Sequence, residues 1–233
     1  MAGFDILHEA QAVSDSGSLT FRQLYVIYIE RLFADLYIDA LLQLKGASQD
    51  YNALRADFAR QIVQRLKQEN LRQPGVPETN ILLSYCLYFW ESFARGYAFE
   101  VEIYRDLTAS GIAFQAHDIR DYQARLSAYD LQILDQYGDI KTSLYFLYTK
   151  RGRHLAHDFY ITRFYEGGRQ RTLVVMLKPF AWEKINGDTV ETTLDEATKL
   201  FPTPALVQIE NRPIVLIDYN VWKERVLKQQ QDK

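Results

Sequence analysis

Residues 129–148 constrain the fold most, because their pattern predicts a β-hairpin. We expect a first strand over residues 131–134, a tight turn over residues 135–138 and a second strand over residues 140–148. The expected turn contains polar side chains and a glycine, which short hairpin loops favour because glycine adopts left-handed backbone angles easily. The chain should therefore contain a β-sheet with this hairpin near its centre.

Charged residues stand at the head of the second expected strand. Side chains alternate faces along a strand, so Asp139, Lys141 and Ser143 should point the same way. The run that follows, residues 144–148, is strongly apolar. Burying charge is costly, so a strand that begins this way pairs its charges or supplies them to a metal ion. A charged hairpin tip in which Asp139 and Lys141 simply pair is the alternative.

The order of these charges resembles that of a known enzyme family. Asp130, a gap of eight residues and then Asp139-Ile140-Lys141 resemble the PD-(D/E)xK nuclease superfamily, which has the restriction-endonuclease-like fold. The resemblance implies that Asp130 and Asp139 hold Mg²⁺ or Mn²⁺, with the Ile140 carbonyl as a further ligand. It also implies that Lys141 positions the attacking water or steadies the phosphate charge.

A preceding helix with an acidic residue belongs to the same resemblance. Residues 96–109 predict such a helix, and Glu100 matches the acidic position, so the resemblance implies that Glu100 supplies a further oxygen ligand to the metal. A rim residue paired with a cation such as Arg95 is the other interpretation of Glu100. The resemblance covers residues 96–178. The sequence departs from the family pattern in two respects. Asp139 stands where glutamate is commoner, and no proline precedes Asp130.

We therefore expect an α/β protein in two parts. Residues 1–95 should form an all-helical N-terminal extension packed on the core, and residues 96–233 a restriction-endonuclease-like core, a mixed central sheet flanked by helices. Expected helices of the extension cover residues 19–42, 51–71 and 81–94, with a kink or a new start at Gly96. Further elements follow the central hairpin: strands over residues 158–165, 172–178, 205–210 and 213–219, and helices over residues 194–200 and 221–228.

The register of the hairpin leaves its metal ligands open. If Leu134 pairs with Asp139, Asp130 lies about four residues from Asp139, or roughly 13 Å at about 3.3 Å per residue. That separation is too large for one metal ion. A bulged hairpin, a longer loop after Asp130, or Asp135 as a substitute for Asp130 would each resolve the difficulty.

Two further features bear on the expected site. His117 and Asp118 could form a metal or acid–base pair, or a surface hydrogen bond. Residues 150–171 contain six Lys or Arg against two acidic residues, a net charge of +4 directly after the expected catalytic strand. A nucleic-acid backbone would need such a basic surface.

Composition limits the classes of protein. The chain has 233 residues, a hydrophobic content of 48% and a net charge of −3, which fit a folded domain rather than a protein coated in nucleic acid. Cys86 is the only cysteine, so an intrachain disulfide and a cysteine-based zinc site are excluded. Neither a signal peptide nor a membrane span is predicted, and we expect a cytoplasmic protein.

The expected function is therefore hydrolysis of phosphodiester bonds, with DNA as the expected substrate and a divalent metal as cofactor. The alternative is a non-catalytic member of the same fold that binds nucleic acid or another protein. The apolar excess of the helices between residues 19 and 94 predicts a homodimer through them.

Overall fold

The computed structural model describes residues 4–14, 17–45, 48–71, 80–148, 155–166, 169–177, 188–209 and 211–232. The chain divides into two compact units, Met1–Val101 and Glu102–Lys233. The boundary falls inside one continuous helix, α4 (Asn80–Ala109). No helix in these described ranges is long and apolar enough to cross a bilayer.

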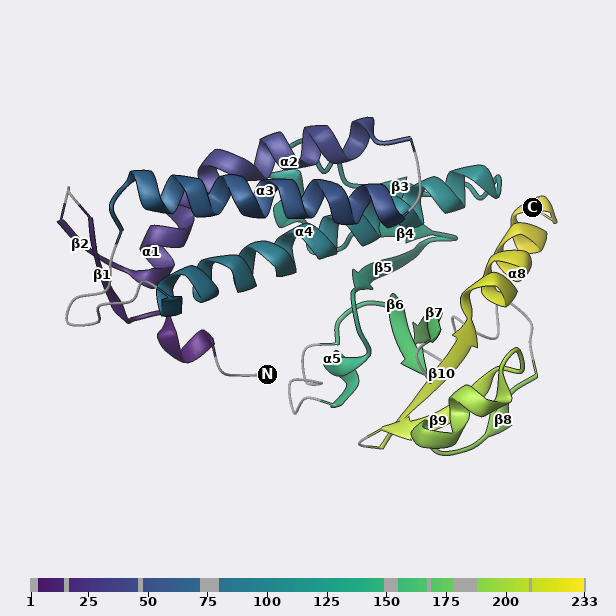
Figure 1. The fold of residues 1–233 in the computed structure, drawn as a ribbon. Helices are drawn as coiled ribbons and strands as arrows, with labels where there is room; N and C mark the ends of the chain where they lie inside the picture. Colours follow the sequence, from purple (N-terminus) through teal and green to yellow (C-terminus); the bar gives the residue numbers. More distant parts are fainter. Residues whose placement is uncertain are drawn as a thin grey trace. The chain divides into compact units, whose positions relative to one another are not determined.

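The N-terminal unit is mainly helical (Figure 1). Its elements are η1 (Asp5–Leu7), β1 (Gln11–Ser14), β2 (Gly17–Thr20), α1 (Phe21–Tyr25), the π-helical turn η2 (Val26–Glu30), α2 (Arg31–Gln43), α3 (Ser48–Gln68) and the first part of α4. The prediction of an all-helical extension is wrong in one respect, because β1 and β2 pair as an antiparallel hairpin before the first helix. Thr20 ends the hairpin and caps α1 through a capping box with Gln23.

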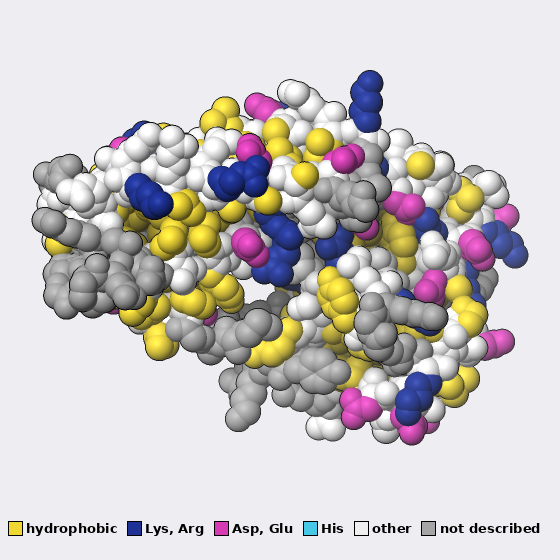
Figure 2. All heavy atoms as spheres, in the orientation of Figure 1, with side chains coloured by type: hydrophobic (Ala, Val, Ile, Leu, Met, Phe, Trp, Pro, Cys, Tyr) yellow, Lys and Arg dark blue, Asp and Glu magenta, His cyan; other side chains and the backbone are white. Residues whose placement is uncertain are grey.

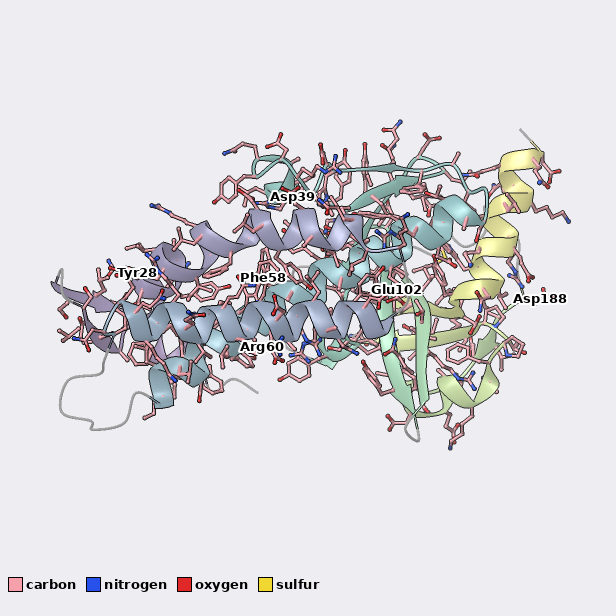
Figure 3. The ribbon with its side chains drawn as sticks, turned by 45° about the horizontal axis from the view of Figure 1, so that its top comes forward. Tyr28, Asp39, Phe58, Arg60, Glu102 and Asp188 are labelled. Atoms are coloured by element: carbon pink, nitrogen blue, oxygen red, sulfur yellow. The ribbon has the colours of Figure 1, made fainter. Side chains whose placement is uncertain are left out.

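Aromatic rings fill the interior between α2, α3 and α4. The Trp90 ring lies 5.3 Å from the Tyr37 ring and 5.9 Å from the Phe58 ring, measured between centroids. The Tyr37 hydroxyl donates to the Ala94 carbonyl at 3.0 Å, which satisfies its one buried polar group. Phe58 and Arg60 lie on opposite sides of α3 (Figure 3), one buried and one in solvent, as the predicted amphipathic pattern requires.

Some apolar surface of the N-terminal unit stays exposed. Leu32 and Leu36, one turn apart on α2, are both exposed. Hydrophobic side chains also gather where α3 ends and α4 begins (Figure 2), and a pocket there is lined by Val63, Leu66 and Leu82. The homodimer expected from the sequence stays a prediction.

Helix α4 is longer than the sequence predicted, because it continues through Gly96. A Cβ atom at Gly96 would meet nothing within 4 Å, so this glycine imposes no break. The helix ends as predicted at Gly111, whose φ of +71° is left-handed. There the Ile112 amide donates to the Leu107 carbonyl at 3.1 Å, as in a glycine-terminated helix.

The C-terminal unit is built on a mixed sheet of eight strands in the order β3-β4-β5-β6-β7-β10-β9-β8. Pairing is antiparallel except between β5 and β6 and between β8 and β9. The strands are β3 (Gln115–Ala116), β4 (Leu131–Ile133), β5 (Gln136–Lys141), β6 (Phe159–Glu166), β7 (Arg169–Met176), β8 (Val190–Glu191), β9 (Ala205–Ile209) and β10 (Arg212–Asp218). The predicted hairpins β6–β7 and β9–β10 are confirmed.

Helices flank this sheet. They are η3 (Ala124–Leu126), α5 (Tyr145–Tyr148), α7 (Leu194–Ala197), η5 (Thr198–Leu200) and α8 (Tyr219–Gln231). Helix α8 packs on β7 and β10, and its buried Trp222 ring lies 5.5 Å from the Phe159 ring of β6. The expected α/β class with a mixed, helix-flanked sheet is therefore confirmed.

The predicted strand over residues 140–148 is wrong beyond Lys141, where β5 ends. Residues 145–148 form α5 instead. Leu144 and Leu147, three residues apart, are buried, whereas Tyr145 between them is exposed. Buried positions three residues apart are typical of a helix. A short apolar run does not show whether its residues follow the helical or the strand period.

Candidate metal and catalytic site

The turn between β4 and β5 consists of two residues, not four. Leu134 and Asp135 have φ values of +51° and +63°, and Gln136 already pairs with Ile133. Two consecutive left-handed residues are typical of a tight hairpin turn whose twist matches the strands. The predicted turn over residues 135–138 is therefore wrong.

Gly138 lies inside β5 for a different reason than a turn. It pairs with Leu131, and a Cβ atom added to it would lie 2.2 Å from the Phe159 ring atom Cζ of the neighbouring strand. The glycine allows a phenylalanine ring to cross the strand at close range. A glycine is therefore required at this position, but because β6 approaches closely and not because the backbone makes a left-handed turn.

The corrected register places Asp130 beside Asp139. The Asp130 amide donates to the Gly138 carbonyl at 3.0 Å, and its carboxylate oxygen Oδ2 accepts from the Ile140 amide at 2.6 Å. These two bonds bracket Asp139, so the separation of roughly 13 Å expected from the sequence does not apply. Asp135 lies in the exposed turn and has no place as a substitute for Asp130.

Asp130 is held from several directions. The Tyr104 hydroxyl on α4 donates to the Asp130 carbonyl at 3.0 Å, and the His117 amide donates to the same carbonyl at 3.3 Å. Its side chain is only 17% exposed. The backbone of Asp130 is thus fixed by bonds to its carbonyl, and its carboxylate by the bond from the Ile140 amide, before any ligand arrives.

His117 is the neighbour of Asp130 across the sheet edge. The β3–β4 ladder pairs Ala116 with Leu131, and one step further brings His117 to Asp130. Their ring and carboxylate atoms, Nδ1 and Oδ1, lie 3.9 Å apart, with the histidine side chain 7% exposed. The expected partnership of His117 with Asp118 is not formed, because the Asp118 carboxylate accepts from the Arg120 amide at 2.9 Å in a local turn.

Glu100 lies on α4, one helical turn before Tyr104. It belongs to the N-terminal unit, whereas the other predicted site residues belong to the C-terminal unit, so its place in the site stays a prediction. Within the C-terminal unit the structure brings Asp130 next to His117, a histidine that the sequence had grouped differently.

Asp139 and Lys141 form an ion pair with each other. The Asp139 side chain is 11% exposed and the Lys141 side chain 44% exposed, so the ammonium reaches solvent while the carboxylate is nearly buried. His157 approaches the same carboxylate, with 3.9 Å between Nε2 and Oδ2. Burial raises the pKa of Tyr160 beside this histidine, and the negative charge of Asp139 adds to the effect.

The predicted basic segment is described only in part. Lys150, Arg151, Arg153 and His154 lie outside the described residues, as does the side chain of Arg169. Arg163 is paired with Glu102 at 2.5 Å and is 14% exposed. Arg171 lines a polar pocket together with Glu102 and Asp218. Of these two described cations, Arg163 is therefore paired with a carboxylate, and Arg171 shares a pocket with two.

The donor set suits a divalent cation. A carboxylate and an imidazole are recurrent ligands of divalent metals, and the Asp130 and His117 atoms Oδ1 and Nδ1 lie 3.9 Å apart. The Ile140 amide is already engaged by Asp130, which keeps β5 against the ligand cluster. A cation held here would lie next to the Asp139–Lys141 pair.

The signal that could have identified His117 is the strand register. With a two-residue turn, the β4–β5 ladder pairs Leu131 with Gly138. The β3–β4 ladder pairs Ala116 with Leu131, and its continuation by one residue brings His117 opposite Asp130. A four-residue turn would shift the pairs between β4 and β5 and would leave those between β3 and β4 unchanged.

No family model matches this sequence, and no curated protein or solved structure matches it either.

Proposed function

We propose that this protein is a divalent-metal-dependent hydrolase of phosphodiester bonds, with DNA as the substrate. The observation that supports it most is the bracketing of Asp139 by the two hydrogen bonds of Asp130. This arrangement follows the expected order of an acidic helix, an Asp-bearing strand and a D-x-K strand.

Each residue has a role that its surroundings support. Asp130 would hold the cation through its hard oxygen atoms, which Mg²⁺ and Mn²⁺ prefer. Lys141, charged and exposed on one side, orients a phosphate oxygen or the attacking water. Asp139 keeps that ammonium in place, and the hydrogen bond from Ile140 to Asp130 fixes the two carboxylates relative to each other. The bound cation would supply Lewis acidity toward the phosphate.

The test is a cleavage assay on plasmid DNA, single-stranded DNA and RNA with Mg²⁺ or Mn²⁺, and with EDTA. Asp130→Asn and Lys141→Met should each lower the cleavage rate by about a hundredfold or more, because each removes charge that stabilises the transition state. Asp135→Asn is the matched control: it lies in the same hairpin, in the exposed turn, and should keep the wild-type rate.

Metal-independent cleavage, or cleavage that survives both site substitutions, would refute the proposal. So would the absence of cleavage on every substrate by a folded wild-type protein.

One observation favours the second candidate, a non-catalytic binding module. Asp139 and Lys141 neutralise each other, which is what a purely structural hairpin would do. A module of this kind would bind nucleic acid with equal affinity in Mg²⁺ and in EDTA, and the wild-type protein would leave it intact.

A further inference from the structure

We infer that the C-terminal unit contains a second ligand site, a polar cavity that binds a basic α-amino acid such as L-arginine. The inference does not rest on the proposed function, because Asp130, Asp139 and Lys141 do not line this cavity.

The cavity has a volume of about 400 Å³ and lies among α4, β7 and the start of α8. Sites for small molecules usually have volumes of about 300–1,000 Å³. The polar side chains of its lining include both signs of charge: Glu102, Asp106, Arg171, Thr172, Asp218 and Asn220. Three carboxylates and one guanidinium give this lining a net charge of −2.

The two carboxylates on α4 are paired with cations that are more deeply buried than they are. Glu102 (labelled in Figure 3) and Asp106 lie one helical turn apart. Glu102 pairs with Arg163 at 2.5 Å, and Asp106 pairs with Lys223 at 2.6 Å. Both cations are 14% exposed, whereas the carboxylate side chains are 37% and 43% exposed. Each carboxylate therefore keeps an open side, where the ammonium or guanidinium of a ligand can form charge-assisted hydrogen bonds.

Arg171 is a cation of the cavity that forms no ion pair with any described residue, although three carboxylates share the cavity with it. A guanidinium binds a carboxylate or a phosphate through two parallel hydrogen bonds. A phosphate dianion would be repelled by a lining with a net charge of −2, so a carboxylate joined to cationic groups fits better. A basic α-amino acid has one carboxylate for Arg171 and two cations for the acidic residues.

Tyr219 adds a buried donor to the same cavity. Its side chain belongs to a residue that is 6% exposed, and its hydroxyl forms no hydrogen bond with any described residue. Burial raises the pKa of this hydroxyl, and the nearby charges of Asp106 and Glu102 raise it further, although Asp106 is not in hydrogen-bonding geometry with it. Buried donors without a partner are rare in folded proteins, and a bound ligand or an ordered water would supply the missing acceptor.

The experiment is calorimetric titration of the full chain. L-Arginine is compared with agmatine, which has the same guanidinium and an amine but no carboxylate, and L-glutamate and inorganic phosphate are the anionic probes. Arg171→Gln removes the guanidinium. Asp218→Asn removes a negative charge but keeps a residue that can cap α8, where Asp218 accepts from the Asn220 amide at 2.9 Å. Arg212→Gln, at the exposed start of β10, is the matched control.

We expect one L-arginine to bind per chain, at least about tenfold more tightly than agmatine, because only L-arginine can pair with Arg171. Arg171→Gln should weaken L-arginine binding by about tenfold or more and should not weaken agmatine binding. Asp218→Asn should weaken the binding of both by about threefold or more, because both are cations. Arg212→Gln should leave both affinities unchanged.

Agmatine that binds the wild-type protein as tightly as L-arginine would overturn the inference, because the cavity would then be a site for cations alone. Tighter binding of phosphate or L-glutamate, or no binding of L-arginine at millimolar concentration, would also overturn it. The comparison of L-arginine with agmatine needs only the wild-type protein, so it decides the question even if Arg171→Gln fails to fold. Circular dichroism of the variants shows whether they are folded, and an equal loss of affinity in Arg212→Gln and Arg171→Gln would contradict the assigned site.

Discussion

Gly138 is the residue at which the hairpin depends most on the absence of a side chain. Substitution by alanine places a methyl group against the buried Phe159 ring, which is also packed on Trp222. We predict that Gly138→Ala lowers the free energy of unfolding by about 1–3 kcal/mol, the usual cost of overpacking. Urea denaturation of purified protein measures this directly.

Gly96→Ala is the control for that measurement. Gly96 lies in the interior of α4 and a Cβ atom there meets nothing, so alanine should raise the free energy of unfolding by about 0.5–1 kcal/mol. A Gly138→Ala protein as stable as wild type would mean that Phe159 does not cross the strand at this point.

At the scale of elements, the two-residue turn fixes the register on which the whole site depends. Asp135 has a φ of +63°, which proline cannot adopt. We predict that Asp135→Pro lowers the free energy of unfolding by about 3 kcal/mol or more, whereas Asp135→Gly stays within about 1 kcal/mol of wild type. Thermal and urea unfolding of the two variants provide the comparison.

If the turn instead covered residues 135–138, Asp135→Pro would be the more stable of the two variants, since Asp135 would then occupy the first turn position with a negative φ. Hydrogen exchange of the Ile133 and Gln136 amides in Asp135→Pro would show whether the loss of stability begins at the turn.

Much of the order of helices and strands could be predicted from the sequence, because a long segment with a clear hydrophobic period favours one type of secondary structure. The helices α2 and α3, the hairpins β6–β7 and β9–β10, and the cap at Gly111 follow from spacing and turn residues alone. The β1–β2 hairpin, the continuity of α4 and helix α5 could not, because short or uniformly apolar runs do not distinguish strand from helix. The order of Asp130 and Asp139 could be read from the sequence, but their closeness and the approach of His117 to Asp130 depend on the strand registers.

At the scale of the whole molecule, burial of ionisable groups predicts instability in alkali. Burial raises the pKa of Tyr37, Tyr85 and Cys86 each to about 12, from ordinary values of 10 for tyrosine and 9 for cysteine, and it also raises the pKa of Tyr25. The folded protein therefore retains protons that the unfolded chain releases first.

The free energy of unfolding should accordingly be constant below about pH 9 and fall between about pH 9 and pH 12. Urea midpoints measured at intervals from pH 8 to pH 11 test this. Tyr25→Phe should make the fall shallower, whereas Tyr145→Phe, in which the ring is exposed, should leave it unchanged. A midpoint that rises with pH in this range would contradict the assignment of these groups to the core.

The central claim is that Asp130, next to the Asp139–Lys141 pair, binds a divalent cation. Anomalous diffraction from Mn²⁺-soaked crystals, recorded on both sides of the manganese absorption edge, tests it most directly. We predict one strong peak at the Asp130 carboxylate in wild-type crystals and its loss in Asp130→Asn crystals. A strong peak elsewhere with none at Asp130, or a peak that survives the substitution, would contradict the claim.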